Sequence, residues 1–149
     1  LLILDEITDV RNLGAIARSA LSFGADALIV PTTGSAPIQS DSIKASAGAL
    51  LKLQVCRSTS LVNTVKYLQD CGITVMSSSL EAKTPLASLD LNLPLAIVVG
   101  SEDEGVKEHL LRMSDQRFII PQLPEMESLN VSVATGIILY EVYKQRLGS

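Results

Sequence analysis

Short apolar runs alternate with amphipathic helical patterns along the whole chain. The apolar runs predict strands at residues 1–4, 27–30, 51–56, 73–76, 95–99 and 118–120. The helical patterns lie between them, at residues 12–23, 40–48, 61–71 and 106–111, and a last helix starts at Val131. Strands that are apolar throughout are buried on both faces. The alternation therefore predicts an α/β fold, with a largely parallel sheet that has helices on both faces.

The last helix has more apolar surface than one sheet can cover. Ser128 and Asn130, just ahead of it, are both good N-cap residues. One apolar stripe of this helix consists of Val131, Ala134, Ile138, Leu139 and Val142. A second stripe, on nearly the opposite side, consists of Val133, Ile137 and Tyr140. A helix that is apolar on two sides must be covered on both, so we expect one stripe to pack on the sheet and the other on a second subunit.

The composition fits one apolar-rich domain. A chain of 149 residues is the size of an ordinary single domain, and 47% hydrophobic against 19% charged residues again suggests a buried subunit interface. No apolar run approaches the roughly 18 residues of a membrane helix, so no membrane partner is expected. Cys56 and Cys71 lack metal-like spacing and are interpreted as reduced core thiols of a cytoplasmic protein.

The net charge of −4 is unusual for a nucleic-acid-binding protein, which typically has a basic balance. Composition alone therefore argues weakly against an RNA or DNA partner. The chain also begins directly in the strand-like LLIL without an initiator Met. We expect it to be part of a longer protein.

Three predicted strands are followed by polar segments. These are DEITDVRNLGAIAR after Leu4, GSEDEG after Val99 and PQLPEMESLN after Ile120. Ligands of parallel α/β proteins bind beyond the carboxyl ends of the strands, so these segments are the candidate site. The chain has neither of the glycine-rich phosphate-binding motifs, which makes a dinucleotide or nucleoside triphosphate site of the usual kind an unfavoured interpretation.

Individual residues of these segments allow structural and functional interpretations. Arg11 and Arg18 share one helix face, which is either a solvated basic face or a grip for an anion. Asn12 reads as an N-cap, and the acids of GSEDEG complement the dipole of the helix predicted to follow. His109 is a lone surface or packing residue, and no metal site is expected. Together the segments predict a polar pocket made of Arg18, Glu102, Ser128 and Asn130.

The three segments resemble the three motifs of the SpoU/TrmH family of RNA ribose 2′-O-methyltransferases. The matching residues are NLG at 12–14 with Arg18 and FG at 23–24, then VGSEDEG at 99–105, then IP at 120–121 and SLNVSVA at 128–134. The resemblance covers essentially the whole chain, in the right order and spacing. KASAGA at 44–49 further resembles the branch that modifies a guanosine in large-subunit ribosomal RNA.

The resemblance implies a fold, a cofactor and partners. The implied fold is a parallel α/β sheet whose C-terminal segment forms a deep trefoil knot. S-adenosylmethionine is held in that knot largely by backbone groups, at positions that match Gly100, Ile120 and Leu129. The family acts on RNA as a homodimer through its first and last helices, and its members commonly have a separate N-terminal RNA-binding domain. Residues 1–149 would then be the catalytic domain.

The implied reaction is an in-line displacement at the methyl carbon by a ribose 2′-hydroxyl. The family gives a central role to the arginine that matches Arg18, in some accounts as a base. A guanidinium stays protonated in proteins and is a poor proton acceptor, so we favour a clamp on the RNA phosphate. Asn12, Glu102, Ser128 and Asn130 would support Arg18 and line the pocket.

The chain departs from the family pattern in two places. Gln122 and the acidic PEMES stand where the third motif usually has methionine and glycine, and Arg11 lies where proline spacing is common. These departures concern the substrate and leave ribosomal RNA and transfer RNA both open. A non-catalytic RNA-binding protein on the same fold, or a generic nucleotide-binding protein, are the alternatives from other classes.

Overall fold

The computed structural model describes residues 1–125 and 127–148. Its centre is a six-stranded sheet in the order β3-β2-β1-β5-β4-β6, in which every described pairing is parallel. The strands are β1 (Leu2–Asp5), β2 (Ala27–Pro31), β3 (Gln54–Ser58), β4 (Thr74–Ser78), β5 (Leu95–Gly100) and β6 (Gln116–Phe118). The chain builds outward from β1 to β3 and then continues on the other side of β1, so the strand order reverses between β1 and β5.

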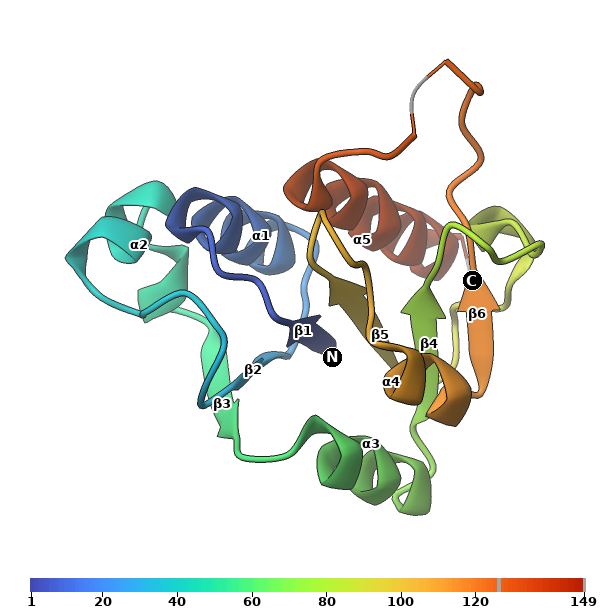
Figure 1. Cartoon of the computed structure of the whole chain (residues 1–149), viewed down its shortest axis with the longest axis horizontal. Coiled ribbons are helices and arrows are strands. Elements are labelled where there is room, and N and C mark those ends of the chain that lie inside the picture. The colour runs from blue at the N-terminus through green and yellow to red at the C-terminus, as the bar shows by residue number, and fades with distance from the viewer. Residues whose placement is uncertain (126, 149) are drawn as a thin grey trace.

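Helices cover both faces of the sheet, as predicted (Figure 1). One face carries α1 (Val10–Ser22), α2 (Ser40–Ala45) and α5 (Val131–Leu147), and the other carries α3 (Leu61–Asp70) and α4 (Glu108–Met113). Alternate residues of the central strands enter the two cores. Leu2 and Leu4 pack with α1 and α5, whereas Ile3 packs with α3 and α4.

Several predicted boundaries are wrong at the edges of the sheet. Strand β3 begins at Gln54 instead of residue 51, because Gly48 adopts a left-handed φ of 82° and leads into a short 3-10 helix, η1 (Ala49–Leu51). Strand β6 ends at Phe118 instead of residue 120, because Ile119 pairs with a loop instead: its N–H donates to the carbonyl of Thr84 (2.9 Å). A second 3-10 helix, η2 (Leu86–Ser88), lies in that loop region.

The prediction that Cys56 and Cys71 lie in the core is also wrong. Both thiols are free and exposed. Cys56 lies on the edge strand β3, and Cys71 follows the last residue of α3, so neither is covered by a second layer. Among the described residues, no helix has the length and apolar character needed to cross a membrane.

The segment after β6 brings the C-terminal helix to the carboxyl edge of the sheet. The carbonyl of Phe118 accepts from the N–H of Ser79, and that of Ile119 accepts from the N–H of Leu86, each at 2.9 Å. The chain then crosses back, and α5 packs along α1 (Figure 1). The N-termini of α1 and α5 thus lie near the end of β5, where the strand order reverses.

Candidate functional site

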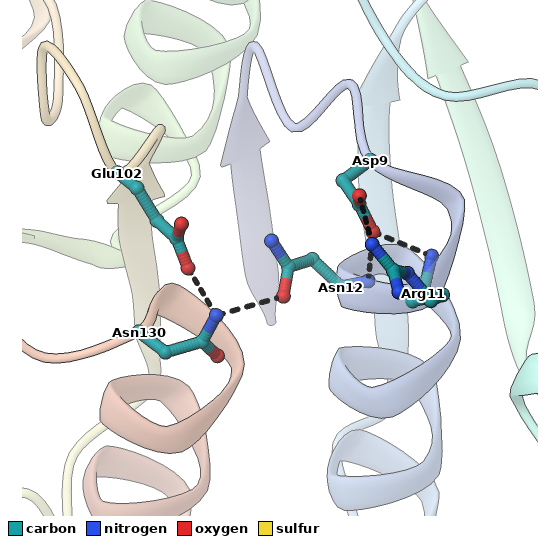
Figure 2. A network of polar contacts seen from close by, with 5 residues as sticks. All are labelled: Asp9, Arg11, Asn12, Glu102 and Asn130. Carbon is teal, nitrogen blue, oxygen red and sulfur yellow. Dashed lines mark hydrogen bonds and ion pairs between the residues drawn. The ribbon is translucent and has the colours of Figure 1, made fainter.

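Asn130 joins three segments that are distant in the sequence. It is the N-cap of α5, where its Oδ1 accepts from the N–H of Ser132 (3.0 Å) and of Val133 (3.4 Å). Its Nδ2 donates to Oδ1 of Asn12 (3.1 Å) and to a carboxylate oxygen of Glu102. Figure 2 shows the three side chains pointing toward one another from α5, α1 and the loop after β5. Both ends of the Asn130 amide are therefore in use.

Glu102 stabilises a different helix from the one predicted. Oε1 of Glu102 accepts from the N–H of Val131 (3.2 Å), at the first residue of α5. A carboxylate at this position complements the positive end of the helix dipole. Helix α4 begins only at Glu108, so the prediction that Glu102, Asp103 and Glu104 open that helix is wrong. The loop folds back toward α5 instead.

Asp9, not Asn12, caps α1. Oδ1 of Asp9 accepts from the N–H of Asn12 (3.0 Å) and of Arg11 (2.8 Å). The bond from Asn12, followed by the bond and the positive charge of Arg11, lowers the pKa of Asp9 below its usual value. The cap at Asp9 places Asn12 within the first turn of α1, so that its side chain can reach Asn130 (Figure 2). An acid three residues before Asn12 is the sequence signal that could have located this cap.

A cavity of about 500 Å³ adjoins this network. It lies at the carboxyl ends of β4, β5 and β6, and α5 forms part of its wall. The residues predicted to bind the cofactor, Gly100, Ile120 and Leu129, all line it. Glu102 and Ser128 line it as well. The structure thus brings five predicted site residues into one cavity wall, and Asn12 and Asn130 adjoin it through Glu102.

Asp5 and Lys107 belong to the same region, and they were not identified as site residues from the sequence. Asp5 is only 3% exposed, and its Oδ2 accepts from the backbone N–H of Lys107 (2.8 Å). Burial raises the pKa of Asp5, against the opposing effects of that bond and of the Lys107 charge. The Lys107 ammonium forms an ion pair with Glu6, and Lys107 is one of the residues that line the cavity. An acid that directly follows an apolar strand is the signal that could have pointed to Asp5.

Arg18 lies apart from the network within one chain. It follows Asn12 by six residues, which is about 9 Å along a helix, and it projects in a different direction. Its side chain is exposed and forms none of the hydrogen bonds or ion pairs found among the described residues. It does not line the cavity. The predicted pocket of Arg18, Glu102, Ser128 and Asn130 is therefore not assembled by a single chain.

No group of three or more His, Cys, Asp or Glu side chains in the described ranges is arranged to hold a metal ion. The contacts of Glu102 with α5 give the acidic loop 102–104 a structural role. The residues of this site offer hydrogen bonds, fixed charge and apolar contact.

Replacing Asn130 by Asp tests the network. Aspartate caps a helix about as well as asparagine, but it cannot donate to Asn12 and would place a second carboxylate against Glu102. We expect Asn130→Asp to lower the free energy of unfolding by about 1–3 kcal/mol at neutral pH, measured by urea denaturation. Adding Glu102→Gln should recover most of the loss, because the amide introduced by that second substitution can donate to the new carboxylate. Unchanged stability of the single variant would mean that the bonds donated by Nδ2 contribute nothing.

Comparison with known proteins gives a consistent result. The model of the SpoU rRNA Methylase family matches residues 1–140. An uncharacterized tRNA/rRNA methyltransferase of Mycobacterium leprae (strain TN) is 39% identical over 146 residues, which are 98% of this chain and 47% of that protein. The 23S rRNA (guanosine-2′-O-)-methyltransferase RlmB of Photorhabdus laumondii is 39% identical over 146 residues, 98% of this chain and 60% of that protein. The chain thus spans about half of the length of these relatives.

A solved structure of similar fold contains a bound cofactor. It is the SpoU methyltransferase AviRb from Streptomyces viridochromogenes in complex with the cofactor AdoMet. The two proteins are 27% identical and superpose with a TM-score of 0.90 over 99% of this chain and 60% of that one.

Proposed function

Because the chain belongs to the SpoU rRNA Methylase family, we propose that it transfers a methyl group from S-adenosylmethionine to a ribose 2′-hydroxyl of RNA. The observation that carries the proposal is the meeting of the three polar segments at one edge of the sheet. Asn12, Glu102 and Asn130 are hydrogen-bonded to one another beside the cavity that Gly100, Ile120 and Leu129 line. A generic nucleotide-binding protein would not require that arrangement.

The cavity fits S-adenosylmethionine in size and chemistry. Its volume of about 500 Å³ lies in the range of cofactor sites. Ile120, Leu129 and Val131 supply an apolar wall suited to an adenine ring, and Glu102 and Glu104 supply negative charge for the sulfonium and amino groups. The AdoMet complex of AviRb supports the same cofactor. When bound, this cofactor would supply a methyl group carried on a positively charged sulfur; the sulfur would leave as a neutral thioether, and the proton of the 2′-hydroxyl would be lost to solvent.

The main role of the site residues is to position the RNA, because the activated methyl group of the cofactor needs little further chemical catalysis. Arg18 clamps the phosphate beside the target ribose and thereby fixes the 2′-hydroxyl, since guanidinium donors match phosphate geometry. The Asn12–Asn130–Glu102 network holds the N-termini of α1 and α5 in register with the cavity. The Ser128 hydroxyl lines the same cavity. Holding the reactants in alignment supplies a large part of the lowering of the activation barrier in such transfers.

We further propose a homodimer through α1 and α5. Val133 and Tyr140 are 52% and 53% exposed, and Ile137 is 41% exposed. Leu21 of the neighbouring helix α1 is also exposed, and Arg18 lies about one turn before it. A second copy that covers the face would place the partner's Arg18 at the interface. This arrangement accounts for the separation of Arg18 from the network of its own chain.

A charge in the centre of that face tests the dimer. We expect Ile137→Glu to convert the protein to monomers at micromolar concentration, because a buried unpaired carboxylate is costly. Sedimentation velocity measures the change. Leu51→Glu is the matched control, since Leu51 is 73% exposed and lies outside the α1–α5 face; that variant should stay dimeric. A wild-type chain that sediments as a monomer would refute the proposal.

The C-terminal trefoil knot is also part of the proposal. Residues 118 and 119 are hydrogen-bonded to the 79–86 loop, and the chain then returns across the sheet edge to α1. Such a path supports a knot in which the 79–86 loop surrounds the segment that leads to α5. The same path explains why the cavity is lined by residues from both segments.

The function is tested by nucleoside analysis of RNA treated with the protein. The chain is incubated with S-adenosylmethionine and, separately, with unmodified 23S ribosomal RNA and bulk transfer RNA. Digestion and mass spectrometry then locate the added methyl group. We expect 2′-O-methylguanosine from ribosomal RNA, because the RlmB relative acts on that class and matches 98% of this chain. A methyl group on a base would contradict the proposal, and product from transfer RNA alone would correct the substrate.

A further inference from the structure

A second hollow, of about 350 Å³, lies between β3 and α3. It is at the carboxyl edge of the sheet, as the cavity is, but on the other side of the point where the strand order reverses. Helix α3 packs against β4 and α4, which leaves Cys56 and Arg57 on β3 exposed. Asn63 and Tyr67 project from α3 along the opposite wall. We call this hollow the β3–α3 groove.

The groove lies in the most basic part of an acidic chain. Residues 42–69 contain Lys44, Lys52, Arg57 and Lys66 and no Asp or Glu, although the whole chain has 16 acidic residues and a net charge of −4. All four basic side chains are exposed. The overall charge therefore hides a basic segment of the sequence that includes β3 and most of α3, and Arg57 of this segment lines the groove. Phosphate binding depends on such local charge.

The groove also combines an exposed aromatic ring with an available guanidinium. Tyr67 is 68% exposed. Arg57 uses one N–H on the carbonyl of Thr32 (3.3 Å), which orients the side chain and leaves most of its five donors available. The hydroxyls of Ser58 and Thr64, which also line the groove, are hydrogen-bonded to each other (2.8 Å) and fix the first turn of α3. Aromatic stacking of bases beside basic side chains is how proteins bind single-stranded RNA.

We propose that the β3–α3 groove binds single-stranded RNA that flanks the target nucleotide, with a base stacked on Tyr67 and a phosphate on Arg57. The inference rests on the proposed function, because it assigns a contact surface to the same substrate. Strand β3 is three strands from β5, which is about 14 Å at the usual strand spacing. A few nucleotides span that distance, so one RNA strand can occupy the groove and reach the cavity.

Binding of a fluorescein-labelled oligouridylate, measured by fluorescence anisotropy at low salt, tests the two contacts. Arg57→Gln and Tyr67→Ala should each raise the Kd about tenfold, the size expected for one stacked base or one charged contact. Tyr67→Phe should bind as wild type, because stacking needs the ring and not the hydroxyl. Arg57→Gln should also reduce the slope of log K against log salt by about 0.7.

Arg117→Gln is the matched control. Arg117 is an exposed arginine on β6, the opposite edge strand, and it also donates one hydrogen bond to a backbone carbonyl, that of Leu111 (2.9 Å). Its loss changes the net charge by the same amount. If Arg117→Gln weakens binding as much as Arg57→Gln does, the effect is one of overall charge and the groove proposal is wrong.

The two exposed cysteines give an independent measurement. Cys56 lines the groove, and Cys71 lies beyond the last residue of α3. In a Cys71→Ser variant, saturating oligouridylate should slow maleimide modification of Cys56 at least severalfold. In a Cys56→Ser variant, the same oligonucleotide should leave the modification rate of Cys71 unchanged.

The possible outcomes test the groove proposal and the proposed function independently of each other. Methyl transfer by the wild type, together with unprotected Cys56 and unchanged binding by Arg57→Gln and Tyr67→Ala, would overturn the groove and leave the function intact. Protection of Cys56 without any 2′-O-methyl product would overturn the function and support the groove. A chain that neither binds the oligonucleotide nor protects Cys56 also overturns the groove.

Discussion

Arg18→Ala is expected to lower kcat/KM for methyl transfer by about a hundredfold to a thousandfold, the size of effect typical of losing one electrostatic contact in an active site. The Kd for S-adenosylmethionine should stay the same, because Arg18 does not line the cavity. Arg18→Lys should fail almost as completely, since an ammonium is a point charge and does not reproduce the planar fork of a guanidinium. Methyl transfer into RNA measures the first effect, and titration calorimetry measures the second.

Arg11→Gln is the control for Arg18. Arg11 is an arginine of the same helix, its side chain is 90% exposed, and among the residues that the structure describes it forms an ion pair with Asp9 (3.6 Å). Its replacement should leave turnover near that of the wild type. Sedimentation must show that Arg18→Ala is still a dimer, so that lost activity cannot be attributed to dissociation. Near-normal turnover by Arg18→Lys would contradict the clamp, and weakened cofactor binding by Arg18→Ala would place this arginine in the cavity.

The interior of the fold could be predicted from the sequence because its signals are strong there. Strands β1 and β5 are buried at every position, and a continuous apolar run indicates such strands directly. The edge strands differ. In β3 three of the five residues are exposed, and in β6 two of the three are, so neither has an apolar run that marks its ends. Their limits are set by Gly48 and by the pairing of Ile119 with Thr84, which are tertiary features.

The sequence predicted which residues belong to the site, but not how those residues are hydrogen-bonded to one another. The motifs pointed to the family, which the family model confirms, and five of the predicted residues line one cavity. Asn130 was expected to cap α5 and does. Its bond to Asn12 spans 118 positions, and a contact of that kind depends on the topology that joins α1 to α5. The separation of Arg18 from this network could not be foreseen either, because one chain alone suggests a single pocket.

The two apolar stripes of α5 were also predicted from the sequence. The second stripe of the last helix, Val133, Ile137 and Tyr140, was predicted from periodicity alone, and these three side chains are exposed in the single chain. In the first stripe Val131, Ile138 and Leu139 are buried, and Ala134 and Val142 are half-buried. Periodicity therefore distinguished the two faces of α5 correctly. What covers the second face is the subject of the dimer proposal.

Gly100→Ala is expected to destabilise the protein strongly and to remove cofactor binding. Gly100 is the last residue of β5, and the loop that follows turns back so closely that a Cβ here would overlap the carbonyl of Gly105 and the backbone nitrogen of Val106. Backbone atoms cannot swing aside as a side chain can. The turn would have to open, which would displace the buried Val106 and the bond from Lys107 to Asp5. Overpacking of this kind costs about 3 kcal/mol or more.

Gly136→Ala is the comparison that isolates this close approach. A Cβ at Gly136 would lie 3.6 Å from Oγ of Ser19, an ordinary contact, and alanine favours a helix over glycine by about 0.5–1 kcal/mol. That variant should melt at or slightly above the wild-type temperature. Gly100→Ala should melt well below it, and at a temperature where it is still folded, calorimetry should detect no binding of S-adenosylmethionine, because the opened turn is part of the cavity wall. Wild-type melting and cofactor affinity in Gly100→Ala would show that the turn can relax, and that the glycine at the end of β5 is not what shapes the site.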